Sequence, residues 1–436
     1  MLNENKKIKL HLLRVTERVY FLILFVHLVC NVQAQKRIAL VGGTVIPVEK
    51  SSTPFKGTIL IHGSKVSQIL IGEKPKIPAD FQIIDVSGKY IIPGLIDGHA
   101  HVSSREQRAI LSHWGITAIL NPNSSLSDIS NENHMQPEYD DTIARVLATG
   151  PLLGSGAFKA FGAMVVEQLD DVHNSISTLK SAGILAVKLM YDDLGYILPP
   201  LEMMNPELMR AVIQEAHQSG LKVFVHALNL ENAKEVLKAG ADAILHSVVS
   251  DTIDEEFINL MLRNKAFYVP TFSVFEASAD IAMWGGRLKE IDITPAIQPL
   301  YDSLLNPATM KQFRSIYSNT YLLADRLPVI RDNLKRVSEA RIPIVMGTDT
   351  NAPGVLPGVS SIMELILEVE NGLSPLGALQ TATINAAKAL GLSDFYGSIA
   401  PGKIADIVVL NRNPLSNIRA LTDINMVILG GRVLRR

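Results

Sequence analysis

The chain has 436 residues, of which 47% are hydrophobic and 19% are charged, and this is enough apolar material for a large buried core and a smaller second unit. Its formal net charge of -2 at pH 7 leaves no cationic excess to neutralise nucleic-acid phosphates or anionic lipid headgroups. We therefore expect a globular protein without a nucleic-acid partner.

Residues 1–34 are typical of a secretory signal peptide. Five lysine and arginine residues between Lys6 and Arg18 precede an apolar run at residues 19–30, and Ala34 stands at a suitable cleavage position. The run is shorter than the roughly 20 residues of a spanning helix, so a membrane anchor is the weaker alternative. We expect a periplasmic or extracellular mature protein that begins near Gln35 and meets the membrane only during export.

The only cysteine, Cys30, lies in that segment, where lipid attachment is a further alternative. The mature chain would contain no thiol, so it could form neither a disulfide nor a thiolate metal site. Any metal ligands must then be nitrogen and oxygen atoms.

Short alternating runs, such as residues 58–61 and 82–86, indicate a small β unit near the N-terminus. A similar pattern returns only at residues 405–410 and 426–433. We expect residues 36–92 and 396–436 to form one composite β-sandwich domain.

Residues 93–395 alternate helix-like segments with short apolar runs. Candidate strands lie at residues 95–101, 118–122, 152–154, 186–190, 223–226, 243–246, 267–271 and 344–349. Eight strands separated by helices predict an α/β protein with a (β/α)8 barrel of the TIM type. Residues 273–340 are too long for one crossover and predict a helical insertion near the barrel mouth, with an enlarged seventh helix as the alternative.

Five residues of metal-ligand type stand at the ends of these strands. His99 and His101 are one residue apart, so on a strand they project to the same face and can reach one ion. His226 and His246 end two consecutive strands, and Asp349 ends the eighth strand, which neighbours the first in a closed barrel. Because barrel enzymes hold their chemistry at the carboxyl ends of the strands, the pattern indicates a metallohydrolase.

Four longer motifs carry a resemblance to a known family. They read Ile-Pro-Gly-Leu-Ile-Asp-Gly-His-Ala-His at 92–101, Gly-Thr-Asp at 347–349, Ala-Leu-Gln-Thr-Ala-Thr-Ile-Asn-Ala-Ala at 378–387 and Gly-Ser-Ile-Ala-Pro-Gly-Lys-Ile-Ala-Asp at 397–406. Over nearly all of residues 38–436 the chain resembles the amidohydrolase superfamily. The similarity is greatest to the branch of imidazolonepropionase-like proteins and metal-dependent Xaa-Pro and Xaa-Arg dipeptidases.

The resemblance implies two divalent metal ions, expected to be zinc. His99, His101 and Asp349 would bind one ion, and His226 and His246 the other, while Lys188 would bridge them as a carbamate formed with CO₂. A carbamate offers two anionic oxygens, whereas an ammonium has no lone pair to share with a cation. An ion-paired, unmodified Lys188 is the alternative.

The resemblance also implies a reaction. The ions would generate hydroxide from water near neutral pH, and Asp349 would accept a proton from this water and pass it to the leaving nitrogen. We expect an exported enzyme that cleaves a C–N bond of a small-molecule amide, peptide or cyclic amide. A lactone or ester hydrolase, a decarboxylase and a non-catalytic metal-binding or structural homologue are the alternatives.

Departures from the dipeptidase pattern leave the substrate open. The tyrosine that those relatives carry two residues after the first histidine of the second group is replaced here by Leu228, and Leu245 and Ser247 flank His246 in place of an acidic residue and a glycine. Tyr191, which follows the Lys188 strand, is a candidate substrate contact or part of a solvated loop. Surface or packing roles are expected for the remaining candidates, His113, His134, His173 and His217. The sequence leaves a homo-oligomer open.

Overall fold

The computed structural model describes residues 37–435 except 50–52, 73–74, 103, 128, 130–141, 292–297 and 305. The predicted signal peptide, with Cys30, and His134 lie outside the described residues. In the described part of the chain, no helix combines the length and apolar character needed to cross a membrane.

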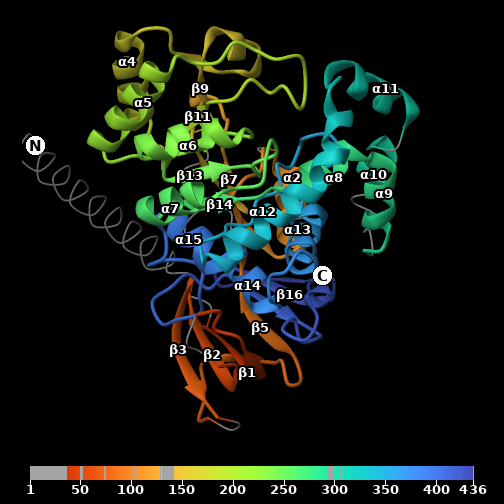
Figure 1. Cartoon of the computed structure of the whole chain (residues 1–436). Coiled ribbons are helices and arrows are strands. Elements are labelled where there is room, and N and C mark those ends of the chain that lie inside the picture. Colours follow the sequence, from red (N-terminus) through yellow and green to blue (C-terminus); the bar gives the residue numbers. More distant parts are fainter. Residues whose placement is uncertain are drawn as a thin grey trace, which may run out of the picture.

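Strands from both ends of the chain share one mixed sheet. Its members are β1 (Arg37–Val45), β2 (Phe55–His62), β3 (Lys65–Ile71), β4 (Gln82–Asp85), β5 (Tyr90–Pro93), β15 (Ile407–Leu410), β16 (Ile424–Leu429) and β17 (Arg432–Arg435). The order is β17-β16-β15-β5-β1-β2-β3, and β4 pairs with β1. The junction between the two ends is the antiparallel pair β5–β15, in which Pro93 faces Ile407. This sheet lies at one end of the molecule, below the helices in Figure 1.

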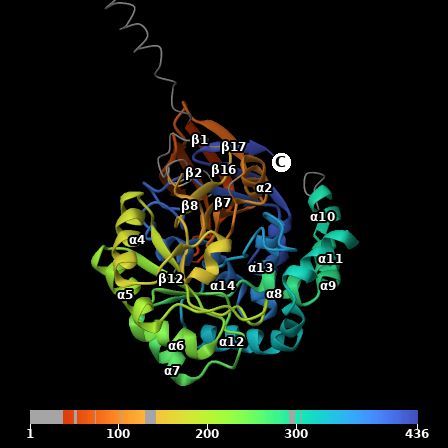
Figure 2. The same cartoon turned by 90° about the horizontal axis from the view of Figure 1, so that it is seen from above.

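The central strands are all parallel. One group consists of β6 (Leu95–Asp97), β7 (Ile116–Asn121) and β8 (Arg145–Ala148), and the other of β9 (Leu153–Gly154), β10 (Met164–Val165), β11 (Ala186–Met190), β12 (Lys222–His226), β13 (Ala243–Leu245) and β14 (Phe267–Val269). Figure 2 shows helices in an outer ring around these strands. The ring includes α4 (Leu169–Ser181), α5 (Pro206–Gln218), α6 (Leu230–Ala239), α7 (Glu255–Asn264) and α12 (Leu327–Glu339).

The third barrel position is split into two short strands. β8 pairs with β7 on one side, and β9 pairs with β11 on the other. Gly150, with a φ of 73°, and Pro151 separate the two pieces. Proline cannot donate to a ladder, so regular pairing stops there.

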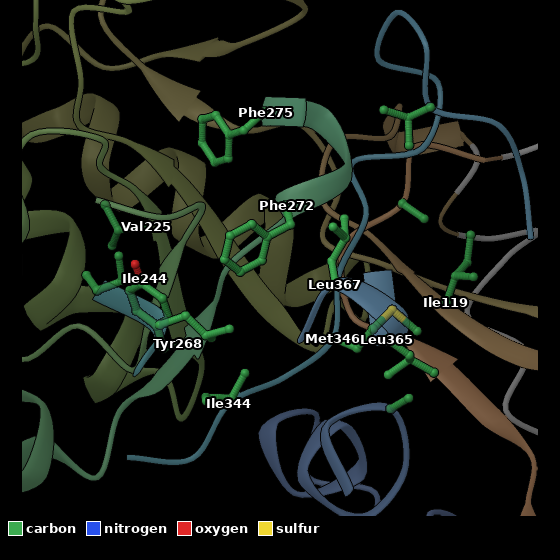
Figure 3. Close-up of a cluster of buried hydrophobic side chains, with 14 of the residues drawn as sticks. Ile119, Val225, Ile244, Tyr268, Phe272, Phe275, Ile344, Met346, Leu365 and Leu367 are labelled. Carbon is green, nitrogen blue, oxygen red and sulfur yellow. The ribbon is translucent and has the colours of Figure 1, made fainter. Parts of the chain in front are cut away.

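The eighth position is extended without forming a regular strand. Val345 N donates to Tyr268 O at 2.9 Å, and Gly98 N donates to Met346 O at 2.8 Å. These bonds join β14 to β6 through residues 343–350 and close the barrel. The side chains of Tyr268 and Ile344 lie in one buried apolar cluster with Ile244 from β13 (Figure 3).

Amphipathic sequences and end signals explain the outer helices. Asn205 caps the N-terminus of α5, Pro206 occupies its first turn, and one face of the helix buries Met209, Val212 and Ile213. Gly240 ends α6 with a φ of 107°, a left-handed conformation that glycine adopts without steric strain. Further helices are α2 (Arg105–His113), α13 (Val359–Glu370), α14 (Pro375–Gln380), the π-helical turn Thr381–Asn385 and α15 (Ala386–Ala389).

The described part of residues 273–340 is mostly helical. It contains α8 (Phe272–Ala279), α9 (Ile281–Lys289), α10 (Gln298–Leu304), α11 (Pro307–Ile316), the 3₁₀ segment Thr320–Arg326 and α12. α9, α10 and α11 stand together at one side of the barrel, whereas α12 belongs to the outer ring (Figures 1 and 2). Residues from α8, α11 and the 3₁₀ segment reach the cavity described next.

Candidate metal centre

A cavity of about 300 Å³ opens at the carboxyl ends of the barrel strands. Each of the six predicted ligands contributes to its wall. They are His99 and His101 after β6, Lys188 on β11, His226 at the end of β12, His246 after β13 and Asp349 at the eighth position. The parallel strands therefore bring together residues that are up to 250 positions apart in the sequence.

His99, His101 and Asp349 form a compact group. Asp349 Oδ1 lies 3.3 Å from His99 Nε2 and 3.1 Å from His101 Nε2. One potential ligand atom from each of the three residues lies within 4.8 Å of the others. Two imidazole nitrogens and one carboxylate oxygen at this spacing can converge on a single cation.

His226 and His246 extend this group across the floor of the cavity. The ring centroids of His226 and His246 are 4.3 Å apart, and those of His246 and His99 are 4.6 Å apart. Lys188 lies on β11, whose register places Met190 beside His226 and Lys188 two residues earlier, beside Phe224. The lysine side chain is buried among these groups.

Three buried ring nitrogens in the cluster lack a hydrogen bond. In the described structure they are His99 Nδ1, His99 Nε2 and His226 Nε2, and of these His99 Nε2 has only the 3.3 Å approach of Asp349 Oδ1. Buried polar atoms are nearly always satisfied, because leaving one unpaired is costly. The donor set of imidazole nitrogens and carboxylate oxygen suits a borderline divalent cation such as zinc, so the residues fit the predicted metal.

The protonation states also favour metal binding. Burial, followed by the charge of Lys188, lowers the pKa of His99 to about 3. Burial likewise holds the pKa values of His226 and His246 well below the usual histidine value. These imidazoles are therefore neutral near pH 7, and each has a lone pair available for a cation.

The pKa values of Asp349 and Lys188 are shifted in the directions that their predicted roles, a carboxylate ligand and a carbamate, require. Burial acts to raise the pKa of Asp349, but hydrogen bonds from His101 and His99 outweigh it and hold this pKa well below the usual range. Burial lowers the pKa of Lys188 to about 7, although the Asp349 carboxylate opposes that shift. Near neutral pH the carboxylate is ionised and a large fraction of the lysine is a neutral amine.

His246 and Asp349 both have left-handed backbone conformations, with φ of 69° and 61°. For residues other than glycine, such conformations cost on the order of 1–3 kcal/mol each and persist where the surrounding structure imposes them. Here they occur directly at the ends of barrel positions, where they direct the two side chains into the cavity. Strain of this kind clusters at functional sites, and here it falls on two of the predicted ligands.

Thr271 orients the His246 ring. Its Oγ1 lies 2.9 Å from His246 Nδ1, which leaves Nε2 as the nitrogen for a cation. Thr271 also has a positive φ of 48° and immediately precedes α8. Glu364 on α13 fixes this junction because it accepts hydrogen bonds from Phe272 N and Ser273 N, both at 2.6 Å. Figure 3 shows Phe272 and Phe275 as part of the buried cluster at the start of α8.

Asp97 connects the first and eighth barrel positions. It accepts hydrogen bonds from His99 N at 3.1 Å, Thr348 Oγ1 at 2.8 Å and Ser361 Oγ at 2.9 Å. Burial raises its pKa to about 6, against the lowering effect of these bonds. Asp97 thus holds the main chain of one ligand strand against the segment that carries Asp349.

The Thr271 contact leads to a testable prediction. Thr271→Val keeps the branched shape but removes the hydroxyl, so we expect about 10–100-fold weaker metal affinity, the range for loss of an outer-shell partner. Competition with a chromogenic chelator measures the affinity. Thr178→Val, on α4, is the matched control and should leave it unchanged; an unchanged affinity in Thr271→Val would refute the orienting role.

Tyr191 lies outside the site that the cavity brings together. Its hydroxyl donates to Glu235 Oε2 at 2.6 Å, and the residue does not line the cavity. It is buried beside α6 and is not in a solvated loop. Tyr191 was predicted to contact the substrate or to lie in a solvated loop, and the structure contradicts both predictions. Its side chain points toward α6 and away from the cavity.

Tyr317, which the sequence did not single out, lines the cavity. It follows α11 and is half-buried. Burial, followed by the negative charge of Asp349, raises its pKa. The phenol therefore stays protonated and can donate a hydrogen bond close to the ligand cluster. It is the only phenol among the described lining residues.

The other described histidines lie away from the cavity. His173 contacts Glu215 at 3.1 Å, and His217 contacts Asp242 at 2.9 Å. His113 packs edge-on against Trp114. These contacts agree with the surface and packing roles expected for them.

Comparisons with known proteins agree with this architecture. A sequence model of the amidohydrolase family matches residues 199–434. Imidazolonepropionase from Geobacillus kaustophilus (strain HTA426) is 24% identical over 442 residues, covering 92% of this chain and 96% of the relative. The 5'-deoxyadenosine deaminase of Methanothermobacter thermautotrophicus is 25% identical over 423 residues, covering 87% and 90%.

Among solved structures, a Xaa-Pro dipeptidase with bound methionine in its active site superimposes with a TM-score of 0.72. It is 24% identical, and the match covers 92% of this chain and 100% of the dipeptidase. The likeness confirms the predicted fold of a barrel with a smaller β unit.

Proposed function

Because the chain belongs to the amidohydrolase family, we propose that it is an exported metal-dependent enzyme that hydrolyses a C–N bond of a small amide, peptide or cyclic amide. One observation carries the proposal. One cavity at the carboxyl ends of the barrel strands is lined by four imidazoles, one carboxylate and one buried lysine.

In this proposal His99, His101 and Asp349 hold one divalent ion, and His226 and His246 hold a second. When bound, the ions, which we expect to be zinc, would supply hydroxide near neutral pH and polarise the scissile carbonyl. The Nε2 atoms of His99 and His226 support this assignment, because both are buried without a hydrogen bond and a cation would satisfy them.

Lys188 would bridge the two groups as a carbamate. Only a neutral amine adds CO₂, and the pKa of about 7 keeps much of Lys188 neutral at physiological pH. The carbamate replaces a cation with an anion among the ligands, and it removes the repulsion that an ammonium would exert on the bound ions.

Asp349 is the proposed proton carrier. Its depressed pKa keeps the carboxylate unprotonated at neutral pH, so it can accept a proton from the attacking water. The same group then donates this proton to the leaving nitrogen, which would otherwise depart as an unstable anion. Tyr317, at the edge of the ligand cluster, is placed to hydrogen-bond the substrate.

The names of the relatives describe different C–N substrates, so membership of the family leaves the substrate undefined. A panel of dipeptides, N-acyl amino acids, cyclic imides and neutral amides, with lactones for comparison, would identify the bond. We expect chelator-sensitive release of amine or ammonia, detected by mass spectrometry. Release of CO₂ or cleavage of only lactones would overturn the proposed reaction, as would chelator-resistant hydrolysis.

Export is a separate part of the proposal and rests on the sequence of residues 1–34. We expect the secreted or periplasmic protein to begin near Gln35. Intact-mass measurement of protein recovered from each compartment checks this. A full-length chain that is retained in the cytoplasm would contradict export without affecting the hydrolase assignment.

A further inference from the structure

We infer that the substrate is a neutral amide with a bulky apolar group and no free carboxylate beside the scissile bond. The inference rests on the proposed hydrolysis and defines its substrate class. It follows from the contrast between the polar floor of the cavity and the side walls above it.

One wall is apolar and belongs to a small hydrophobic cluster. Leu152, Met190, Leu194 and Leu198 are buried in this cluster and also line the cavity. Leu152 precedes β9, Met190 ends β11, and Leu194 and Leu198 belong to the segment that follows β11. A side chain of the substrate that contacts this wall would gain from removal of apolar surface from water.

A second apolar part of the lining comes from the helical region and from the turn after Asp349. Val274 on α8 and Phe313 on α11 line the cavity together with Tyr317 and Pro353. The substrate therefore meets apolar surface from two separate parts of the chain, and the aromatic rings of Phe313 and Tyr317 suit a flat or aromatic group.

The walls offer no cation for a carboxylate. Among the described lining residues, Lys188 is the only lysine and no arginine is present. In the proposed enzyme Lys188 would be a metal-bridging carbamate and would carry no positive charge. The sequences of residues 128–141 and 292–297 add no lysine or arginine either. An anionic substrate group on these walls would lose its hydration without gaining a cationic partner.

Four hydrogen-bond donors near the cavity already have acceptors within the protein. The first N–H groups of α8, at Phe272 and Ser273, donate to Glu364. Asn123 Nδ2 donates to Phe161 O at 2.9 Å, and Asn351 Nδ2 donates to His101 O. A carboxylate of the substrate would have to displace these bonds before the same donors could replace the missing cation.

A second hollow adjoins the cavity, and Arg314 is the only lysine or arginine among its described lining residues. It is exposed on α11 and shares that hollow with Tyr317 and Thr320. It does not line the main cavity. A substrate that bound to the metal ligands and to the apolar walls of the main cavity would therefore not contact Arg314.

Two matched amides test the inference on the metal-loaded protein. N-acetylphenethylamine and N-acetylphenylalanine have the same scissile amide and the same phenyl group, and only the second has a carboxylate. We expect kcat/KM for the neutral amide to exceed that for the anion by about tenfold or more, because the anion loses hydration without a partner. Equal values, or preference for the anion, would overturn the inference while leaving the hydrolase proposal intact.

Binding measured by calorimetry separates the two proposals. If neither amide is hydrolysed but the neutral one binds more tightly by a similar factor, the substrate inference stands and hydrolysis of this bond fails. If neither amide binds or reacts, the inference is overturned. An anion preference that disappears in Arg314→Gln would also overturn it and identify Arg314 as the anion partner.

A gain-of-function variant gives an independent readout. Ser278 is half-buried on α8 and lines the cavity, so Ser278→Arg adds a cation to the wall. We expect this variant to shift the ratio of the two kcat/KM values toward N-acetylphenylalanine by about tenfold, a typical effect of supplying one charged partner. Ser278→Gln is the matched uncharged control. An unchanged ratio in a folded Ser278→Arg protein would contradict the inference.

Discussion

Asp349→Asn should lower kcat by about 10²–10⁴-fold, the range expected when a general acid–base is removed. The asparagine side chain has nearly the same shape and keeps an oxygen that can face the metal, but its amide cannot carry the proton from water to the leaving nitrogen. The contacts of Asp349 with His99 and His101 place this residue in the metal group, so metal content must be measured with the rate.

We expect Asp349→Asn to retain most of its metal by elemental mass spectrometry while turnover falls. Asp332→Asn is the control, because Asp332 is an exposed residue of α12 that pairs only with Arg336 among the described contacts. Full turnover in Asp349→Asn would exclude the proton-transfer role. Complete loss of metal would instead assign the effect to ligand binding.

Lys188→Ala is the second change with a large expected effect. It removes the bridging group, so we expect a loss of activity greater than the roughly 10–100-fold cost of deleting an outer-shell partner. The deletion also leaves space in the cavity, and a short carboxylate such as propionate could occupy it and supply two oxygens. Partial recovery with propionate, but not with propionamide, would support an anionic bridge.

Carbamate formation on Lys188 should depend on pH in the unmodified chain. The pKa of Lys188 is lowered to about 7, so the reactive neutral amine predominates above that pH and is lost as the pH falls below it. Metal reloading of apo protein should therefore depend on bicarbonate and weaken below about pH 7, the value set by this pKa. Reloading that is independent of bicarbonate, with no mass increase on Lys188, would favour the unmodified lysine.

The sequence predicted the barrel because its helices and strands follow simple periodic patterns with clear end signals. It missed β8 (Arg145–Ala148), since the Gly150–Pro151 break divides the third position into two short pieces and only the second, at residues 152–154, was recognised. The eighth position was predicted as a strand, yet it makes only isolated bridges, at Ile344 and Thr350. Both differences arise from local backbone irregularity that the hydrophobic pattern does not encode.

The metal-ligand candidates were predictable because a parallel barrel collects the ends of its strands at one rim. The residues around them were not, because their positions depend on tertiary contacts. Glu364 reaches Phe272 across 92 sequence positions, and Tyr317 enters the cavity from a helical region without a barrel motif. The prediction for Tyr191 failed for the same reason, since its partner Glu235 is on the next helix but one.

Stepwise metal titration of the purified apo protein tests the central claim most directly. Zinc is added in portions in the presence of bicarbonate, and bound metal and amide hydrolysis are measured at each step. We expect no hydrolysis in the apo protein, activity that rises as the sites fill, and loss of one bound equivalent in a variant that lacks His226 and His246. Full activity in the apo protein, or a metal content independent of these histidines, would contradict it.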